Sequence, residues 1–219
     1  MKKRTVLFFG ICFLLTILTA FAQGGDLLIQ QYRRGPQLDG KYSKWSFRIG
    51  PQLNRINADL ATSSPTLSLG GLLEIEYRFS KTVGLAASAQ FTPIHYTFLE
   101  GDSLAIDQLQ YLSYPLLLKL QPTAKLSLGL GVIYQDFLKG IKRMEETDPK
   151  LITPYAEGIF KNSLGMLSQV SYHLNSRINV FVNYRWVKRT SPPTQAQTNN
   201  SAGFQLGVSY LFFKSRQRF

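Results

Sequence analysis

The chain has 219 residues with a formal net charge of +12, and 44% of its residues are hydrophobic. This length suits one domain of ordinary size, and the apolar content is ordinary for a globular protein. The single cysteine, Cys12, excludes an intramolecular disulfide framework and a cysteine-rich metal site.

Residues 1–22 have the features of a secretory signal peptide. Lys2–Arg4 form a charged start, Val6–Leu18 form an apolar run, and Ala20–Ala22 bring small residues to the cleavage position. An uncleaved anchor helix is the weaker alternative, because the apolar run is short for a bilayer span. No later apolar run has the about 18 residues of a transmembrane helix. We therefore expect an exported protein.

After a basic segment at 23–44, alternation with a period of two residues dominates the chain. Large apolar residues occupy every second position, which is typical of β-strands rather than helices. Eight segments show this pattern, at 45–53, 67–79, 83–91, 112–120, 126–134, 164–172, 178–186 and 204–212. Short turns at 80–82, 121–124 and 175–177 alternate with long loops at 54–66, 99–110, 138–162 and 188–201. This rhythm predicts an antiparallel up-and-down sheet.

The minor face of these segments carries charged and very small residues. We predict an ion network inside a barrel, formed by Arg48, Glu74, Glu76, Arg78, Lys119 and Arg185. Room for these long side chains would come from Gly70, Gly129, Gly131, Gly203 and Gly207. As an alternative, Glu74 and Glu76 could form a paired acid and base, which would require substrate access to the barrel interior.

Aromatic residues on the apolar face gather near the segment ends. One group falls at the short-turn end, at Trp45, Tyr77, Phe79, Tyr172, Tyr210 and Phe212. The other falls toward the long loops, at Phe91, Tyr114, Tyr134, Tyr184 and Trp186. Two aromatic girdles around an aliphatic band are typical of outer-membrane barrels.

Together these features predict an all-β fold, an eight-stranded antiparallel up-and-down transmembrane β-barrel over 45–213, followed by a basic tail at 214–219. Strands of about 10–12 residues at about 3.3 Å each, tilted by about 45°, span roughly 25 Å, which is the height of the apolar band. A soluble exported ligand-binding barrel or sandwich also alternates, but its apolar face points inward. Charges on the minor face argue against that alternative.

Three stretches resemble the small outer-membrane β-barrels of Bacteroidota grouped as PorT-like or porin-family barrels. They are FRIGPQLN at 47–54, YLSYPLLLK at 111–119 and FQLGVSY at 204–210. Ser113 stands where that family has an inward glutamate, and the chain runs six residues past Phe213. The resemblance implies the fold and the outer membrane, and one branch of the family serves type IX secretion.

The histidines offer one alternative function. His95-Tyr96-Thr97 places a hydroxyl on the same face as the histidine near the loop end, as an outer-leaflet lipid-modifying enzyme would need. His173 falls near the opposite end, so a shared metal site is not expected. No glycine-rich phosphate loop or Cys/His cluster appears. We expect no catalytic residue, no metal and no cofactor.

The turn end is strongly basic. We predict a periplasmic basic collar formed by Arg33, Arg34, Lys41, Lys44, Lys81, Lys125, Arg177, Lys214, Arg216 and Arg218. Its expected partner is anionic: lipid phosphate, the cell wall or an acidic protein. The alternative is that these charges only keep exposed ends solvated. An exported barrel seldom meets nucleic acid, so none is expected as a partner.

The sequence therefore favours a monomeric, non-enzymatic barrel in the outer membrane, with lipid around it and a lumen filled by side chains. Eight strands leave no wide aqueous channel, so a diffusion pore is excluded. The expected role is structural or an interaction role in the envelope, with type IX-like secretion as one setting.

Overall fold

A computed structural model describes residues 43–59, 62–100, 103–144, 152–156, 160–190 and 198–215. Contacts within the chain divide it into two units, 1–40 and 41–219, and every described residue belongs to the second. The predicted signal peptide and most of the 23–44 segment lie outside the described residues, as do residues 216–219. Among the described residues no helix is long and apolar enough to cross a membrane.

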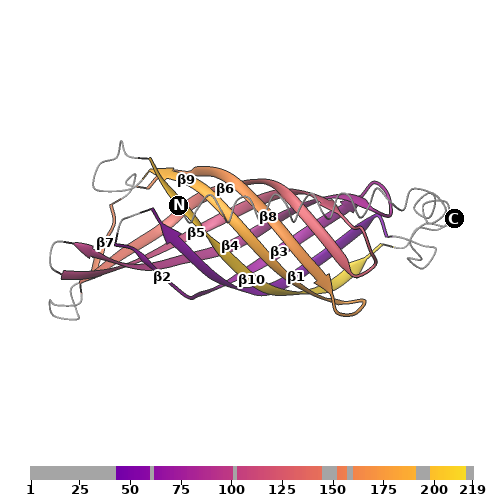
Figure 1. Ribbon diagram of the computed structural model, residues 1–219, viewed down its shortest axis with the longest axis horizontal. Coiled ribbons are helices and arrows are strands. Elements are labelled where there is room, and N and C mark those ends of the chain that lie inside the picture. The colour runs from indigo at the N-terminus through magenta and orange to yellow at the C-terminus, as the bar shows by residue number, and fades with distance from the viewer. Residues whose placement is uncertain are drawn as a thin grey trace, which may run out of the picture. The chain divides into compact units, whose positions relative to one another are not determined.

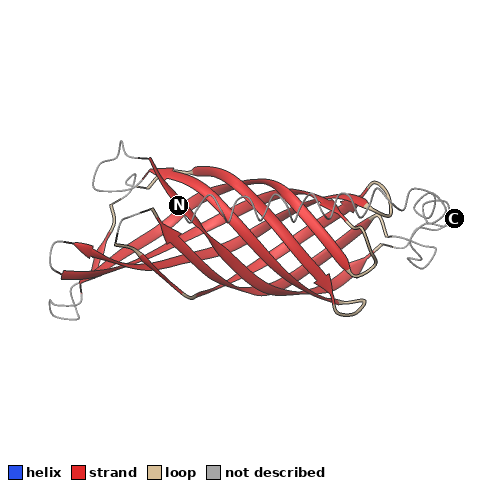
Figure 2. Ribbon diagram, viewed as in Figure 1, coloured by secondary structure: helices blue, strands red, loops and turns tan. Residues whose placement is uncertain are grey.

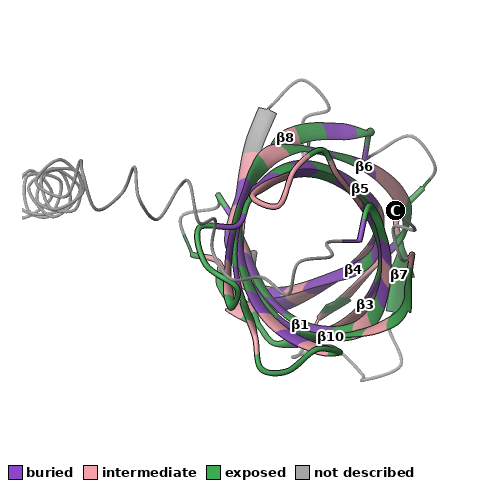
Figure 3. Ribbon diagram, turned by 90° about the vertical axis from the view of Figure 1, so that its right-hand side faces the viewer, coloured by how far each residue is buried: buried purple, intermediate pink, exposed green. Residues whose placement is uncertain are grey.

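Eight long strands form a closed antiparallel barrel (Figures 1 and 2). They are β1 (Trp45–Ala58), β3 (Ser68–Arg78), β4 (Val83–Glu100), β5 (Ser103–Leu120), β6 (Leu126–Met144), β8 (Ser163–His173), β9 (Ile178–Thr190) and β10 (Thr198–Lys214). Each strand pairs with its neighbour in this order, and β10 pairs with β1 to close the ring seen end-on in Figure 3. The predicted all-β, eight-stranded fold is confirmed.

The register fixes the tilt of the strands. Paired residues lead once around the ring from Trp45 through Tyr77, Leu85, Leu118, Leu130, Ser168, Tyr184 and Phe204 to Arg55. The path returns to β1 ten residues further along than it began, from 45 to 55. Because stagger and tilt are linked in a barrel, residues at one height in the lumen come from different register positions on successive strands.

The strands extend beyond the sequence prediction at the loop end. Residues 99–110, predicted as a loop, are largely strand, because β4 runs to Glu100 and β5 begins at Ser103. In the same way β6 continues to Met144. Two short strands, β2 (Ser64–Thr66) and β7 (Ile152–Pro154), pair with β4 and β6 there. In these extensions apolar side chains also face inward, so the outward apolar alternation of a membrane strand is lost. The sequence pattern therefore predicts a loop there.

The outer surface is apolar. Large hydrophobic side chains are exposed on all eight long strands, among them Leu53, Leu69, Leu85, Leu116, Leu130, Met166, Val182 and Leu206. Aromatic rings lie in contact near both strand ends, with Trp45 beside Tyr77 at the turn end and Tyr114 beside Tyr134 toward the loops. Exposure of so much apolar surface on every strand is unfavourable in water and favourable in lipid.

Candidate functional site: the barrel interior and its basic rim

A buried ion cluster fills the lumen at the turn end. Arg48 Nη1 lies 3.0 Å from Glu74 Oε1 and also contacts Glu76, while Lys119 Nζ lies 2.7 Å from Glu74 Oε1. Arg78 Nε donates to Glu76 Oε1 at 2.7 Å. These contacts join β1, β3 and β5, although β5 is separated from β3 by β4 in the ring. The three cations exceed the two carboxylates by one charge.

Arg185, the sixth residue of the predicted ion network, belongs to a strand on another part of the ring. It is fully buried in the middle of β9, where its register partner is Gly203 of β10. Gly203 pairs in turn with Ile56, well beyond Arg48 on β1. Its place in the ion network stays a prediction, because alternation gives the face of a strand and not the height in the lumen, which depends on the stagger of the whole barrel.

Three of the five interior glycines lie beside uncharged side chains, and the other two, Gly131 and Gly203, lie against backbone atoms of neighbouring strands. A Cβ at Gly207 would lie 2.2 Å from Cζ of the Phe181 ring, and one at Gly70 would lie 2.8 Å from Asn54 Nδ2. At Gly129 the nearest side chains are those of Gln169 and Leu117. The sequence predicts that charged side chains occupy this space, whereas an aromatic ring, amides and a leucine lie beside Gly207, Gly70 and Gly129.

Amide side chains line part of the lumen between the ion cluster and the loop end. Gln169 donates to Asn183 at 3.0 Å, and Asn183 donates to Gln205 at 3.4 Å. Gln205 donates in turn to Asn54 at 2.9 Å. This chain connects β8, β9, β10 and β1. A separate apolar cluster lies inside the barrel on other positions of β4, β5, β6, β8 and β9, formed by Ala86, Leu117, Ile133, Leu167 and Val187.

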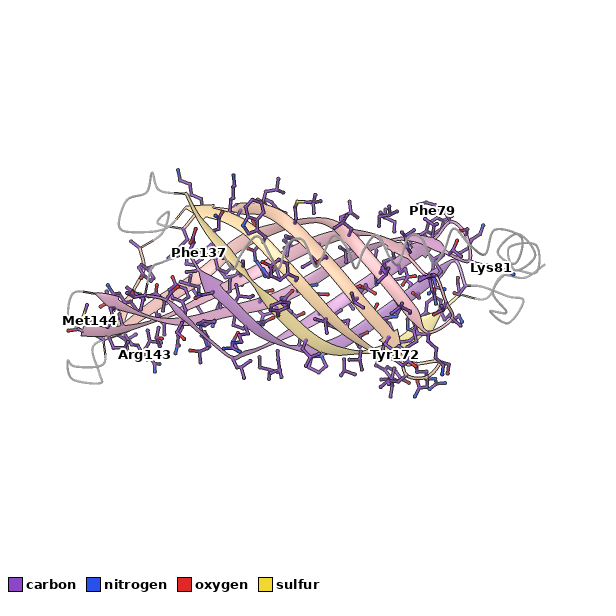
Figure 4. All side chains as sticks on the ribbon, viewed as in Figure 1. Phe79, Lys81, Phe137, Arg143, Met144 and Tyr172 are labelled. Carbon is purple, nitrogen blue, oxygen red and sulfur yellow. The ribbon has the colours of Figure 1, made fainter. Side chains whose placement is uncertain are left out.

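At the loop end an aromatic cluster closes over a buried carboxylate. Tyr96 donates to Asp107 Oδ2 at 2.8 Å, and Tyr155 donates to Oδ1 at 2.9 Å. Phe137 and Phe160 pack nearby, with ring centroids 4.8 Å apart. Around them lie Ile56, Ala58, Ile94, Leu109 and Tyr111. Figure 4 labels Phe137 in this half of the barrel and Lys81 at the opposite end.

The sequence reading placed Asp107 in a surface loop, whereas the side chain is only 3% exposed. One signal could have revealed this site. Tyr96 follows Gln90 and Thr92 at the same parity, and all three face the lumen. Continuing the inward parity of β4 past Pro93 therefore predicts an inward tyrosine.

Among the residues that the structure describes, no catalytic group surrounds His95. This residue is half-buried on β4, where it pairs with Thr66 on one side and Gln108 on the other. The Thr97 hydroxyl donates to the Ser64 carbonyl oxygen at 3.5 Å rather than to the imidazole. Among the described residues no group of three or more His, Cys, Asp or Glu side chains could hold a metal ion.

The turn end carries a ring of cations. Five residues of the predicted collar are described: Lys44, Lys81, Lys125, Arg177 and Lys214. Lys44 precedes β1, Lys214 ends β10, and the other three occupy the turns between strands. No aspartate or glutamate occurs in the described turn-end stretches 43–47, 77–84, 119–127, 172–179 and 209–215. Arg33, Arg34, Lys41, Arg216 and Arg218 lie outside the described residues.

These features define the class as a closed eight-stranded antiparallel β-barrel with an apolar outer face and a filled lumen. The solved structures that it resembles include Ail, the attachment invasion locus protein of Yersinia pestis, at 17% identity and a TM-score of 0.47, covering 78% of this chain and 99% of Ail. The outer membrane protein AlkL matches at 16% identity and a TM-score of 0.49, covering 84% and 98%. OprG from Pseudomonas aeruginosa matches at 17% and 0.42, covering 78% and 97%.

OprG and AlkL are outer membrane proteins and Ail is the attachment invasion locus protein, and at such identities the likeness concerns the fold alone. No protein-family model matches the chain. None of the curated proteins matches it either. The resemblance to PorT-like barrels of Bacteroidota therefore stays a prediction.

Proposed function

We propose that this protein is an outer-membrane β-barrel whose role is structural or an interaction role in the cell envelope. One observation carries the proposal: an apolar, aromatic-edged outer surface surrounds a lumen that contains a buried ion cluster. A soluble ligand-binding barrel would have the opposite arrangement, with its apolar face inside and its charges in water.

The filling of the lumen argues against a diffusion pore. Ion pairs occupy the turn end, amides and an apolar cluster occupy the middle, and aromatic rings occupy the loop end. An eight-stranded barrel is just wide enough for side chains to fill. We therefore assign the lumen to stability, as a cross-brace between strands that are not neighbours in the ring.

The proposal is tested by fractionating cells that produce the tagged full-length chain. The outer-membrane fraction is then run on SDS gels with and without boiling. We expect recovery in the outer membrane and a faster-running unboiled band, because a closed barrel resists detergent. Recovery as a soluble periplasmic protein without a mobility shift would overturn the proposal.

We further infer that contact with other envelope components occurs through the turn-end rim, in an accessory role that includes type IX-like secretion. The cation ring, whose described turn-end stretches contain no aspartate or glutamate, supports this role. The resemblance to PorT-like barrels gives the secretion setting. Deleting the gene and measuring the secreted proteins tests the setting. Unchanged secretion would remove it and leave the barrel proposal standing.

A further inference from the structure

The seam between β10 and β1 differs from the rest of the turn-end rim. The register shifts between Phe47 and Arg48, because Phe47 pairs with Phe213 whereas Arg48 pairs with Leu211. Phe212 is the extra residue of this β-bulge. A bulge leaves consecutive residues on the same side of the strand. Phe212 and Phe213 are accordingly both exposed, by 54% and 51%.

Phe47 packs against both of these exposed rings. Its ring centroid lies 6.0 Å from that of Phe212 and 5.4 Å from that of Phe213. We call Phe47, Phe212 and Phe213 the seam triad. The triad exposes aromatic surface at the edge of the apolar band, where rings favour the boundary between acyl chains and headgroups.

A cation is fixed at the same depth as this edge. Arg177, in the turn between β8 and β9, donates from Nη1 to the hydroxyl oxygen of Tyr210 at 3.0 Å. Its backbone carbonyl accepts from the amide of Leu211 at 2.7 Å, so the turn is tied to the bulged end of β10. Because Tyr210 belongs to the turn-end girdle, the guanidinium lies at the level of lipid headgroups.

Two further cations lie at the seam, where β1 begins and β10 ends. Trp45 and Ser215 are joined by two hydrogen bonds, from Trp45 N to Ser215 Oγ at 3.1 Å and from Ser215 N to Trp45 O at 3.0 Å. Lys44 directly precedes Trp45, Lys214 directly precedes Ser215, and both lysines are exposed. Three cations thus flank the seam triad.

The other turns provide an internal comparison. Lys81 follows Phe79 in the β3–β4 turn, and Lys125 ends the β5–β6 turn. Neither has a hydrogen bond to a girdle tyrosine among the described residues, whereas Arg177 does. Each of these turns presents one cation, and the seam presents three beside the exposed phenylalanine pair.

We propose that the turn end of the β10–β1 seam, together with the adjoining β8–β9 turn, is a binding site for the headgroup of an anionic phospholipid. Arg177, Lys214 and Lys44 attract the phosphate, and the seam triad contacts the glycerol and upper acyl region of the same lipid. A guanidinium forms charge-assisted hydrogen bonds to phosphate oxygens, and its planar fork suits that geometry. This inference rests on the proposed membrane location.

The test uses the full-length barrel in nanodiscs of equal parts phosphatidylglycerol and phosphatidylcholine. Native mass spectrometry then counts the lipids that remain bound to the protein after it is released from the nanodisc. The seam variant is Arg177→Gln with Lys214→Gln, and the matched control is Lys81→Gln with Lys125→Gln, which removes the same charge from other turns. We expect the seam variant to lose retained phosphatidylglycerol by about tenfold or more, given the usual contribution of each cation near an anionic surface. The control should lose clearly less, because Lys81 and Lys125 lie in other turns, away from the seam triad.

Equal losses in both variants would overturn the inference in favour of diffuse attraction by the whole rim. Retention that neither variant changes would overturn it as well. Muropeptides and an acidic peptide are added to the same samples as competing partners. If the seam variant lost binding to either of these and kept its phosphatidylglycerol, the site would belong to that other partner.

Each sample is also run on SDS gels with and without boiling. A missing mobility shift in the wild-type protein would contradict the proposed barrel itself. A normal shift without selective retention of phosphatidylglycerol would contradict only the lipid site. The two failures are therefore distinguishable.

Discussion

The carboxylates at the two ends of the lumen differ in the side chains that contact them. At the turn end, Glu74 and Glu76 are neutralised by three cations from β1, β3 and β5. At the loop end, Asp107 accepts hydrogen bonds from Tyr96 and Tyr155, and aromatic rings surround these groups. A buried carboxylate needs compensation in both places, because an uncompensated charge away from water is costly. Cations and neutral hydroxyl donors thus both contact buried carboxylates inside one barrel.

Breaking the ion cluster should have the largest effect. Glu74→Ala leaves Lys119 without its closest partner and Arg48 with one carboxylate, and we expect a loss of about 3–5 kcal/mol in the free energy of unfolding. Urea titration in lipid vesicles, followed by the gel mobility shift, measures it. Replacing the pair together, with Glu74→Leu and Lys119→Met, should recover most of the loss. A single variant as stable as the wild type would show that the cluster is not a brace.

Breaking the loop-end site should cost less, because the hydrogen bonds that Asp107 accepts from Tyr96 and Tyr155 come from neutral hydroxyls. Asp107→Leu leaves the buried Tyr96 hydroxyl without its acceptor, and we expect a loss of about 1–3 kcal/mol by the same titration. Asp136→Asn is the matched control, because this half-exposed carboxylate lies on β6 outside the buried site. A control that is as destabilised as Asp107→Leu would contradict the difference between the two carboxylates.

Between these two ends, the packing around Gly207 tests how tightly uncharged side chains fill the middle of the lumen. Gly207→Ala would place a methyl group 2.2 Å from the Phe181 ring, and we expect a loss of about 1–3 kcal/mol from overpacking. The double variant with Phe181→Leu should be more stable than the alanine variant alone. Stability measurements on the two single variants and the double variant give the coupling, and strict additivity would refute the contact.

The smallest effect is expected at His95, which belongs to neither end's network. His95→Ala should change the free energy of unfolding by about 0.5 kcal/mol or less. Lipid A incubated with the wild-type and variant barrels should give the same product profile by mass spectrometry. A deacylated product that disappears in the variant would revive the enzyme alternative.

Alternation made the barrel and part of its interior predictable. Arg48, Glu74 and Lys119 occur at inward positions of strands with clear period-two patterns, so their common face follows from the sequence. Their mutual contacts needed the register of the closed barrel, because β1 joins β3, and β4 joins β5, at the loop end and not through a short turn. The alternation of short turns with long loops likewise predicted the described collar residues at one rim.

The rest needed the closed barrel. Arg185 shares the inward parity, but its height depends on the ten-residue stagger accumulated around the ring, which no single segment reveals. Asp107 lies in a stretch that looked like loop, because its strand has inward aromatic and apolar neighbours rather than an outward apolar face. Phe181 opposite Gly207 is likewise a cross-strand packing choice, which periodicity does not specify.

The pairing of the first and last strands has a consequence for folding. Trp45 and Ser215 are separated by 170 residues in sequence, yet they share the bonds that fasten the seam. Contacts between such distant residues are slow to form, because the chain must lose the entropy of a long loop before they stabilise it. The barrel thus stays open-edged until its final strand arrives. Until then the unfinished barrel exposes unpaired strand edges, so avoiding aggregation depends on a factor that covers those edges.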